Sequence, residues 1–267
     1  FESLVQFLKY TGLINMTHEH FAMILIGIVF ITLAIRKNWE PLLLIPIGFG
    51  MIIGNIPFPE GLQIGIYEEG SVMLLPAVKY AEPAEIEYLY RHAGIKQVGE
   101  NRVQQMLEHI EAIDCEGLEF HFIGTLQTNK VKYIIDKVKM IHSLDSLKLA
   151  AEIDKQAKKR GIVIDVLVEV NCGEEENKSG LFPSEVEEFC LCLSQFGNIR
   201  HRGFMTMAPK CEKKEEYLKY FQQTYAQVLD IWTKKLHNID RPIISMGMSE
   251  SFEEAIASGS DIVRIGR

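Results

Sequence analysis

The residues best suited to chemistry lie in the stretch Ile243–Arg267, which has the sequence IISMGMSESFEEAIASGSDIVRIGR. Gly247 allows the backbone to approach a ligand closely, and Ser249 with Glu250 precedes a short amphipathic helix whose free N–H groups favour an anion such as phosphate. Arg264 interrupts a second apolar run, and a buried arginine needs a partner. This stretch therefore predicts a phosphate site beside a buried cation, with a structural strand-end arginine as the alternative.

A second chemical candidate is Lys79, which follows the apolar run LLPAV. Burial lowers the pKa of a lysine and favours Schiff-base chemistry, whereas a side chain that reaches the surface would have no such role. His121 and His142 have no carboxylate or cysteine at a ligand spacing, so we predict no metal site. Cys172 has no obvious activating base and is expected to be incidental.

Short apolar runs alternate with helical patterns from Val72 onward. Strands are predicted at Val72–Lys79, Gln97–Glu100, Phe120–Gly124, Met140–Ser143, Val163–Asn171, Arg202–Met207, Ile243–Met246 and Ile262–Ile265. Helices are predicted at Ala84–Ala93, Val103–Ile113, Asn129–Val138, Ser146–Lys159, Ser184–Phe196, Glu215–Leu236 and Ser251–Ser258.

This alternation predicts an α/β fold, a (β/α)8 TIM-type barrel that lacks its last helix, and an open doubly wound sheet is the rival architecture. In such a barrel the carboxyl ends of the strands face the active site, where Lys79 would meet Asn101, Asn171 and Met205. Barrels often hold phosphates after strands seven and eight, here near Gly247, Met248, Ser249 and Gly266. A lysine, a phosphate loop and Arg264 facing a pyridine nitrogen are what a pyridoxal phosphate (PLP) site requires.

Composition divides the 267 residues into two predicted domains, 1–72 and 73–267. The net charge of −8 argues against nucleic-acid binding, because no strongly basic face is evident. The five cysteines form no C-x-x-C motif, which fits a reducing, cytoplasmic compartment for the second domain.

The first domain is predicted to be mainly helical, hydrophobic and membrane-like. Phe21–Ile35 is uncharged and, with its flanks, approaches the roughly 20 residues that cross a bilayer. Pro41–Pro57 is a second uncharged stretch, broken by proline and glycine as in discontinuous membrane helices. We expect membrane association through residues 18–58, with two soluble core helices as the alternative.

Residues Thr11–Val72, and the block EPLLLIPIGFGMIIGNIP in particular, resemble the beginning of the membrane β-subunit of sodium-pumping biotin-dependent decarboxylases. The later intramembrane residues that this family uses for sodium have no counterpart, so sodium pumping is not expected. The resemblance implies a fusion or chimera, and a non-functional subunit fragment is one alternative for the whole chain.

The remainder, from about Leu74, resembles the pyridoxal phosphate homeostasis protein family, whose barrel is similar to the N-terminal domain of alanine racemase (fold type III). The motifs that carry this resemblance are AVKY (77–80), GENR (99–102), HFIGTLQTNK (121–130), IHSLD (141–145), VEVN (168–171), KSG (178–180), RGFMTM (202–207), SMGMS (245–249) and VRIG (263–266).

The resemblance implies a monomeric barrel that binds PLP without a firmly established reaction and balances the vitamin B6 pool. It implies Lys79 as the aldimine lysine, Ser245–Ser249 and Gly266 as the phosphate region, and Arg264 as the pyridine partner. PLP-dependent apo-enzymes are candidate partners. The alternative is a PLP-dependent racemase, which would need a second acid/base residue opposite Lys79.

Overall fold

The computed structural model describes residues 18–37, 72–175, 177–234 and 241–266. Contacts between Cα atoms divide the chain into two compact units, Phe1–Gly70 and Ser71–Arg267. The predicted broken stretch Pro41–Pro57 lies outside the described residues.

The described part of the first unit is helix α2, His18–Lys37. It is a 20-residue helix whose last turn carries Arg36 and Lys37. Positive charges at this end of a helix interact favourably with the helix dipole. Among the residues that the structure describes, no helix is both long enough and apolar enough to cross a membrane. The expectation of a membrane-like segment at Phe21–Ile35 is therefore unsupported.

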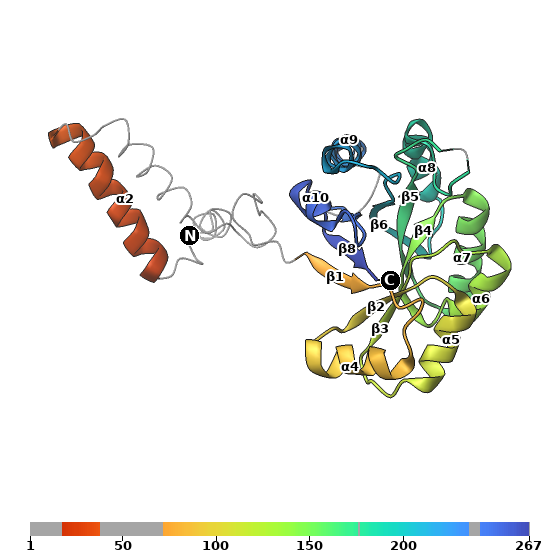
Figure 1. The fold of residues 1–267 in the computed structure, drawn as a ribbon. Coiled ribbons are helices and arrows are strands. Elements are labelled where there is room, and N and C mark those ends of the chain that lie inside the picture. The colour runs from red at the N-terminus through yellow and green to blue at the C-terminus, as the bar shows by residue number, and fades with distance from the viewer. Residues whose placement is uncertain (1–17, 38–71, 176, 235–240, 267) are drawn as a thin grey trace, which may run out of the picture. The chain divides into compact units, whose positions relative to one another are not determined.

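The second unit is a parallel barrel of eight strands in the order β1-β8-β7-β6-β5-β4-β3-β2 (Figure 1). A parallel bridge between Ala77 and Gly99 joins the β1 and β2 ends, and Val78 N donates to Gly99 O at 3.0 Å. The barrel prediction is confirmed. The strands are β1 Met73–Pro76, β2 Gln97–Glu100, β3 Glu119–Phe122, β4 Val138–Leu144, β5 Ile164–Val170, β6 Ile199–Thr206, β7 Ile243–Ser245 and β8 Ile262–Ile265.

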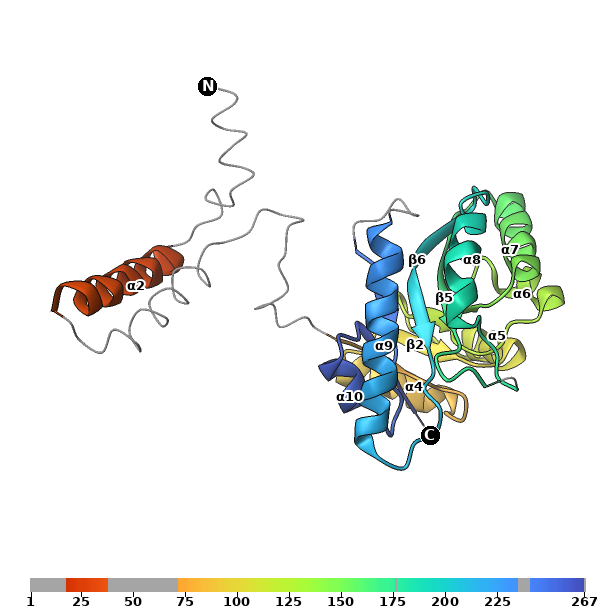
Figure 2. The same ribbon diagram turned by 90° about the horizontal axis from the view of Figure 1, so that it is seen from above.

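Helices on the outside of the sheet cover the strands, and α9 packs along α10 (Figure 2). Every residue of β5 is buried, as expected for a parallel strand with both faces covered. Gly94 and Gly161 end α4 and α7 at a φ of +68°, a conformation that glycine adopts without strain. The helices are α4 Pro83–Ala93, α5 Val103–Ala112, η2 Thr128–Lys130, α6 Val131–Ile134, α7 Leu147–Arg160, η3 Pro183–Glu185, α8 Val186–Leu193, α9 Lys214–Thr233 and α10 Phe252–Ala257.

Two element boundaries differ from the predicted ones in ways that matter for the site. β1 ends at Pro76, so Lys79 lies in the following turn and not on the strand. The predicted helix Asn129–Val138 is a 3-10 turn followed by the four-residue α6, because Val138 already belongs to β4.

Candidate functional site

Lys79 lies just beyond the point where the barrel closes. Ala77 bridges to Gly99, and Gln105 Nε2 donates a hydrogen bond of 2.8 Å to the carbonyl oxygen of Lys79, which attaches this turn to α5. The Lys79 amine lies 5.0 Å from the centroid of the Tyr80 ring. The side chain is half-buried and extends into a cavity rather than into the core.

Arg264 on β8 is buried, with 5% of its surface exposed. Its Nη1 donates to the carbonyl oxygen of Ser245 at 2.9 Å and to Ser245 Oγ at 2.7 Å, and its Nη2 donates to Thr206 O at 2.9 Å. Burial lowers the pKa of Arg264 to about 10, and the charge of Glu169 partly opposes this. Arg264 is therefore still charged at neutral pH while its hydrogen-bond acceptors are all neutral.

The loop after β7 brings backbone and hydroxyl groups next to Arg264. Gly247 has a φ of +93°, and its carbonyl oxygen accepts from Arg264 N at 3.0 Å. Ser249 Oγ donates to Gly266 O at 2.6 Å and accepts from Gly266 N at 3.2 Å. A Cβ at Gly266 would lie 2.3 Å from the carbonyl oxygen of Ala77, so only glycine allows this approach.

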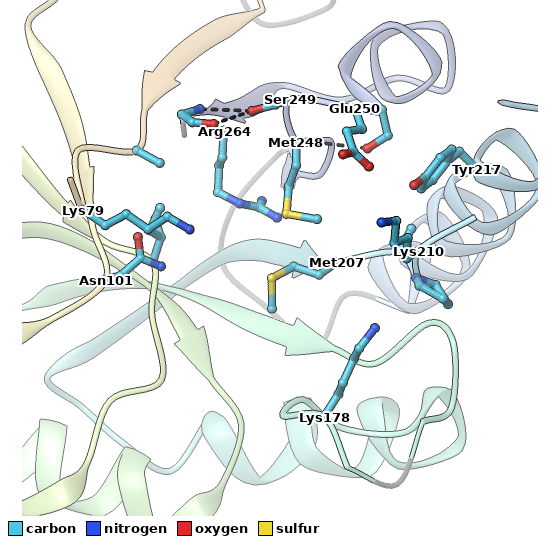
Figure 3. A pocket seen from close by; sticks show the side chains of 16 residues that line it. Lys79, Asn101, Lys178, Met207, Lys210, Tyr217, Met248, Ser249, Glu250 and Arg264 are labelled. Carbon is cyan, nitrogen blue, oxygen red and sulfur yellow. Dashed lines mark hydrogen bonds between the residues drawn. The ribbon is translucent and has the colours of Figure 1, made fainter. Parts of the chain in front are cut away.

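These groups surround one cavity of about 410 Å³ (Figure 3). Of the predicted site residues, the following line it: Lys79, Asn101, Met248, Ser249, Arg264 and Gly266. Ser245 and Gly247 lie behind this wall and hold Arg264.

Two predicted residues are placed elsewhere by the structure. Asn171 does not line the cavity: its Nδ2 donates to Glu175 O at 2.8 Å and its Oδ1 accepts from Glu175 N at 3.2 Å. Met205 is 1% exposed and packs inside the barrel with Met140 and Leu167. Both residues position neighbouring structure and do not contact the cavity.

The cavity also has walls that the sequence did not single out. Met207 lies in the RGFMTM motif and Lys178 in the KSG motif, so the motifs contained a signal for both. Lys210 lies in the segment leading into α9 and Tyr217 in the first turn of α9, and neither belongs to a quoted motif. Figure 3 shows Lys178 and Lys210 across the cavity from Lys79.

A chain of buried hydrogen bonds extends from Arg264 into the barrel. Because an arginine only donates, Ser245 Oγ accepts from it and can donate its own hydrogen to His142 Nδ1, 3.2 Å away. His142 Nε2 then donates to His121 Nδ1 at 2.9 Å. His121 Nε2 is buried without a partner among the described residues. The two histidines thus support Arg264, and no group of three potential metal ligands occurs in the described part of the chain.

Burial keeps both histidines neutral and makes stability depend on pH. It lowers the pKa of His121 to about 4 and that of His142 well below its usual value. The unfolded chain therefore binds more protons between pH 6.5 and 4, so the stability present above pH 6.5 is lost as the pH falls through about 4. For His121 alone the loss approaches about 3 kcal/mol. Chemical unfolding measured at several pH values tests this expectation.

The matched variants are His121→Gln and His92→Gln, the latter an exposed histidine on α4. The first is expected to flatten the dependence of unfolding free energy on pH in this window, and the second to leave it as in the parent chain. Equal slopes in the parent and in His121→Gln would contradict a neutral, buried His121.

A closed parallel barrel with a lysine after its first strand and a buried arginine on its last defines a barrel of the alanine racemase type. The family model described as "Alanine racemase, N-terminal domain" matches residues 68–267. A solved alanine racemase from Clostridium difficile is 18% identical with a TM-score of 0.62, covering 78% of this chain and 52% of its own, and shows the fold alone.

A closer relationship is shown by the "Pyridoxal phosphate homeostasis protein" of Aquifex aeolicus, 45% identical over 198 residues that cover 74% of this chain and 86% of the relative. The chain belongs to the pyridoxal phosphate homeostasis protein family. The structure of PipY from Synechococcus elongatus with PLP bound is 29% identical, with a TM-score of 0.67, covering 73% of this chain and 91% of its own. None of these comparisons supports the resemblance of residues 1–72 to a decarboxylase β-subunit.

Proposed function

We propose that this chain binds PLP covalently through Lys79 and serves PLP homeostasis without a catalytic reaction of its own. The observation that carries the proposal is the convergence of Lys79, Arg264 and the Ser249–Gly266 pair on one cavity. The family name of the Aquifex aeolicus relative and the PLP-bound PipY structure support it.

The residues present fit this cofactor. Gly266 lets the loop approach β1 where any Cβ would overlap Ala77, and Ser249 supplies a hydroxyl at the same point. These two residues would hold the phosphate, and Met248 would line the wall beside them. Arg264 would face the pyridine nitrogen. PLP supplies an aldehyde, which forms a reversible covalent bond with a lysine amine.

Arg264 would determine the protonation state of a pyridine nitrogen bound in this cavity. Its guanidinium has no lone pair to accept a proton, so it can only donate to the ring nitrogen. Ser245 and Thr206 fix its orientation through three hydrogen bonds. The chain thus favours an unprotonated ring nitrogen, which is a weaker electron sink and suits a binding role better than carbanion chemistry.

The remaining functional assignments extend this proposal. Residues 73–267 would act as the binding domain, and PLP-dependent apo-enzymes would be recipients of the cofactor. Asn101 would contact the bound ligand from the cavity wall. The decarboxylase resemblance of residues 1–72 stays a prediction, to which we attach no activity.

An absorbance titration of the full chain with PLP tests the proposal. The same titration of Ser249→Ala tests whether this hydroxyl contacts the phosphate. The variant removes the hydroxyl that contacts Gly266, so we expect PLP to bind about tenfold more weakly, the loss of one charge-assisted hydrogen bond. Pyridoxal, which has no phosphate, should bind the variant and the parent equally.

The matched control is Ser194→Ala, which alters an exposed hydroxyl bonded to its own helix end. It is expected to leave both titrations unchanged. If the parent chain shows no saturable binding of PLP, the proposed function is wrong. If Ser249→Ala weakens the binding of PLP and of pyridoxal equally, Ser249 is not part of the phosphate site.

A further inference from the structure

Lys79 lies in a turn that few packing contacts hold in place. The turn follows β1, and Lys79 lines three cavities, with volumes of about 410, 550 and 410 Å³. The next residue, Tyr80, is 69% exposed. Because packing restrains this turn weakly, the hydrogen bonds that reach it have a larger share in fixing the position of the lysine.

The side chain of Gln105 provides the hydrogen bond that Lys79 itself makes. Gln105 Nε2 donates to the carbonyl oxygen of Lys79 at 2.8 Å, and Lys79 makes no other hydrogen bond to a residue that the structure describes. The neighbouring bonds join backbone groups: Val78 N donates to Gly99 O and Ala81 N donates to Val78 O, each at 3.0 Å. Neither of them involves the peptide group that follows Lys79. Gln105 is therefore the residue that holds this peptide group.

Gln105 can serve as a support because α5 is itself fixed to the barrel. His109 lies one turn further along α5 and is buried, and its Nδ1 is 2.5 Å from Oε1 of Glu100, the last residue of β2. Val103 and Met106 of the same helix are buried in the core. Gln105 thus joins the lysine turn after β1 to a helix that is held on β2.

The position of the Lys79 backbone bears on covalent binding. A lysine side chain has many rotamers, so its nitrogen meets a ligand aldehyde only if the backbone presents the chain from the correct place. A bond between reacting groups forms efficiently only near the correct distance and angle, and a displacement of about 1 Å lowers reactivity strongly. A turn that is free to move would therefore weaken the covalent step before it weakened other contacts to the ligand.

We propose that Gln105 is a positioning residue for the covalent step at Lys79. It acts through the carbonyl group of Lys79 and does not contact the ligand, since Gln105 does not line the cavity that holds Arg264 and Ser249. The inference rests on the proposed function for its meaning, because it concerns the same lysine. Its first test needs no PLP, so the two ideas can fail separately.

Two substitutions separate the hydrogen bond from the shape of the side chain. Gln105→Met places a methyl group where glutamine has its NH₂ group, which removes the donor at nearly constant size. Gln105→Arg restores a donor, because the arginine Nε–H is as many bonds from Cα as the glutamine Nε2. Methionine, arginine and glutamine have similar helix propensities, so α5 itself should be unaffected. The matched control is Gln104→Met, which alters an exposed side chain that bonds to Glu108 on the same helix.

Hydrogen exchange of the full chain without PLP provides the first test. The Ala81 amide closes the lysine turn by its bond to Val78 O, so its exchange rate reports how often the turn opens. We expect Gln105→Met to speed this exchange about fivefold, the factor that corresponds to one neutral hydrogen bond. Gln105→Arg should restore most of the protection, and Gln104→Met should leave it unchanged. Equal exchange in Gln105→Met and in the parent chain would contradict the proposal.

A pair of ligands provides the second test. PLP carries the aldehyde, whereas deoxypyridoxine phosphate has a methyl group in its place and cannot bond to a lysine. Gln105→Met should bind PLP about fivefold more weakly than the parent and bind deoxypyridoxine phosphate equally well. A merely structural role for Gln105 would weaken both ligands by the same factor, and this result would overturn the proposal.

The outcomes distinguish the positioning role from the proposed function. A parent chain that binds PLP no better than deoxypyridoxine phosphate would contradict the covalent bond at Lys79, while the exchange measurement without PLP would still decide whether Gln105 holds the turn. Thermal unfolding checks that each variant is folded. Should Gln105→Met fail to fold, Gln105→Glu gives the same comparison, because it keeps the shape of glutamine and has no donor when ionised.

Discussion

Lys79→Ala is expected to abolish covalent trapping of PLP by borohydride, with no measurable label where the parent chain takes up one equivalent. Lys79 has no carboxylate partner among the described residues and extends into the cavity beside Arg264 (Figure 3). Lys178, in contrast, pairs with Glu175. A free amine is the nucleophile in imine formation, so the unpaired lysine nearest Arg264 is the one expected to react.

Lys210→Ala is the matched control, because Lys210 lines the same cavity from its far side. This variant should be trapped as fully as the parent. The assignment of Lys79 is wrong if Lys79→Ala still takes up a full equivalent while Lys210→Ala does not.

Gly203→Ala is expected to cost about 3 kcal/mol or more of unfolding free energy and to remove the site with it. Gly203 has a φ of +148°, where a side chain is strained, and an added Cβ would lie 2.0 Å from the carbonyl oxygen of Ile243. Gly203 and Ile243 are paired neighbours on β6 and β7, and these two strands carry Thr206 and Ser245. Arg264 bonds to both, so forcing β6 from β7 would misplace the arginine.

Gly197→Ala provides the comparison, since Gly197 is exposed and an added Cβ there meets nothing within 4 Å. Urea unfolding should show a large drop in midpoint for Gly203→Ala and little change for Gly197→Ala. Similar midpoints for the two variants would show that the β6–β7 approach tolerates a side chain.

The barrel could be predicted because most of its strands contain short apolar runs between helical patterns. β5 is the clearest case, since a strand buried on both faces has to be apolar throughout most of its length. The phosphate loop stays a prediction, and it rests on a similar local pattern: Gly247 and Ser249 follow one strand, and Arg264 lies on the next.

Two predicted site residues that do not line the cavity, Asn171 and Met205, have surroundings set by tertiary contacts. Asn171 follows a strand end as predicted, but its amide bonds to the backbone of Glu175 and does not line the cavity. Met205 alternates with its neighbours along β6 and faces the barrel interior. Lys178 and Lys210 come from loops, whose path no hydrophobic pattern specifies.

The expected membrane segment was predicted from composition and finds no support in the described residues. Phe21–Ile35 lacks charges, yet no helix among the described residues satisfies both the length and the apolarity needed for a span.

Peptide mass mapping of the parent chain after PLP addition and borohydride reduction tests the central claim most directly. The proposal predicts a single modified peptide, carrying the label on Lys79, because this amine shares the cavity with Arg264 and Ser249. A label located on Lys178 or Lys210, or spread over surface lysines without enrichment at Lys79, would contradict it.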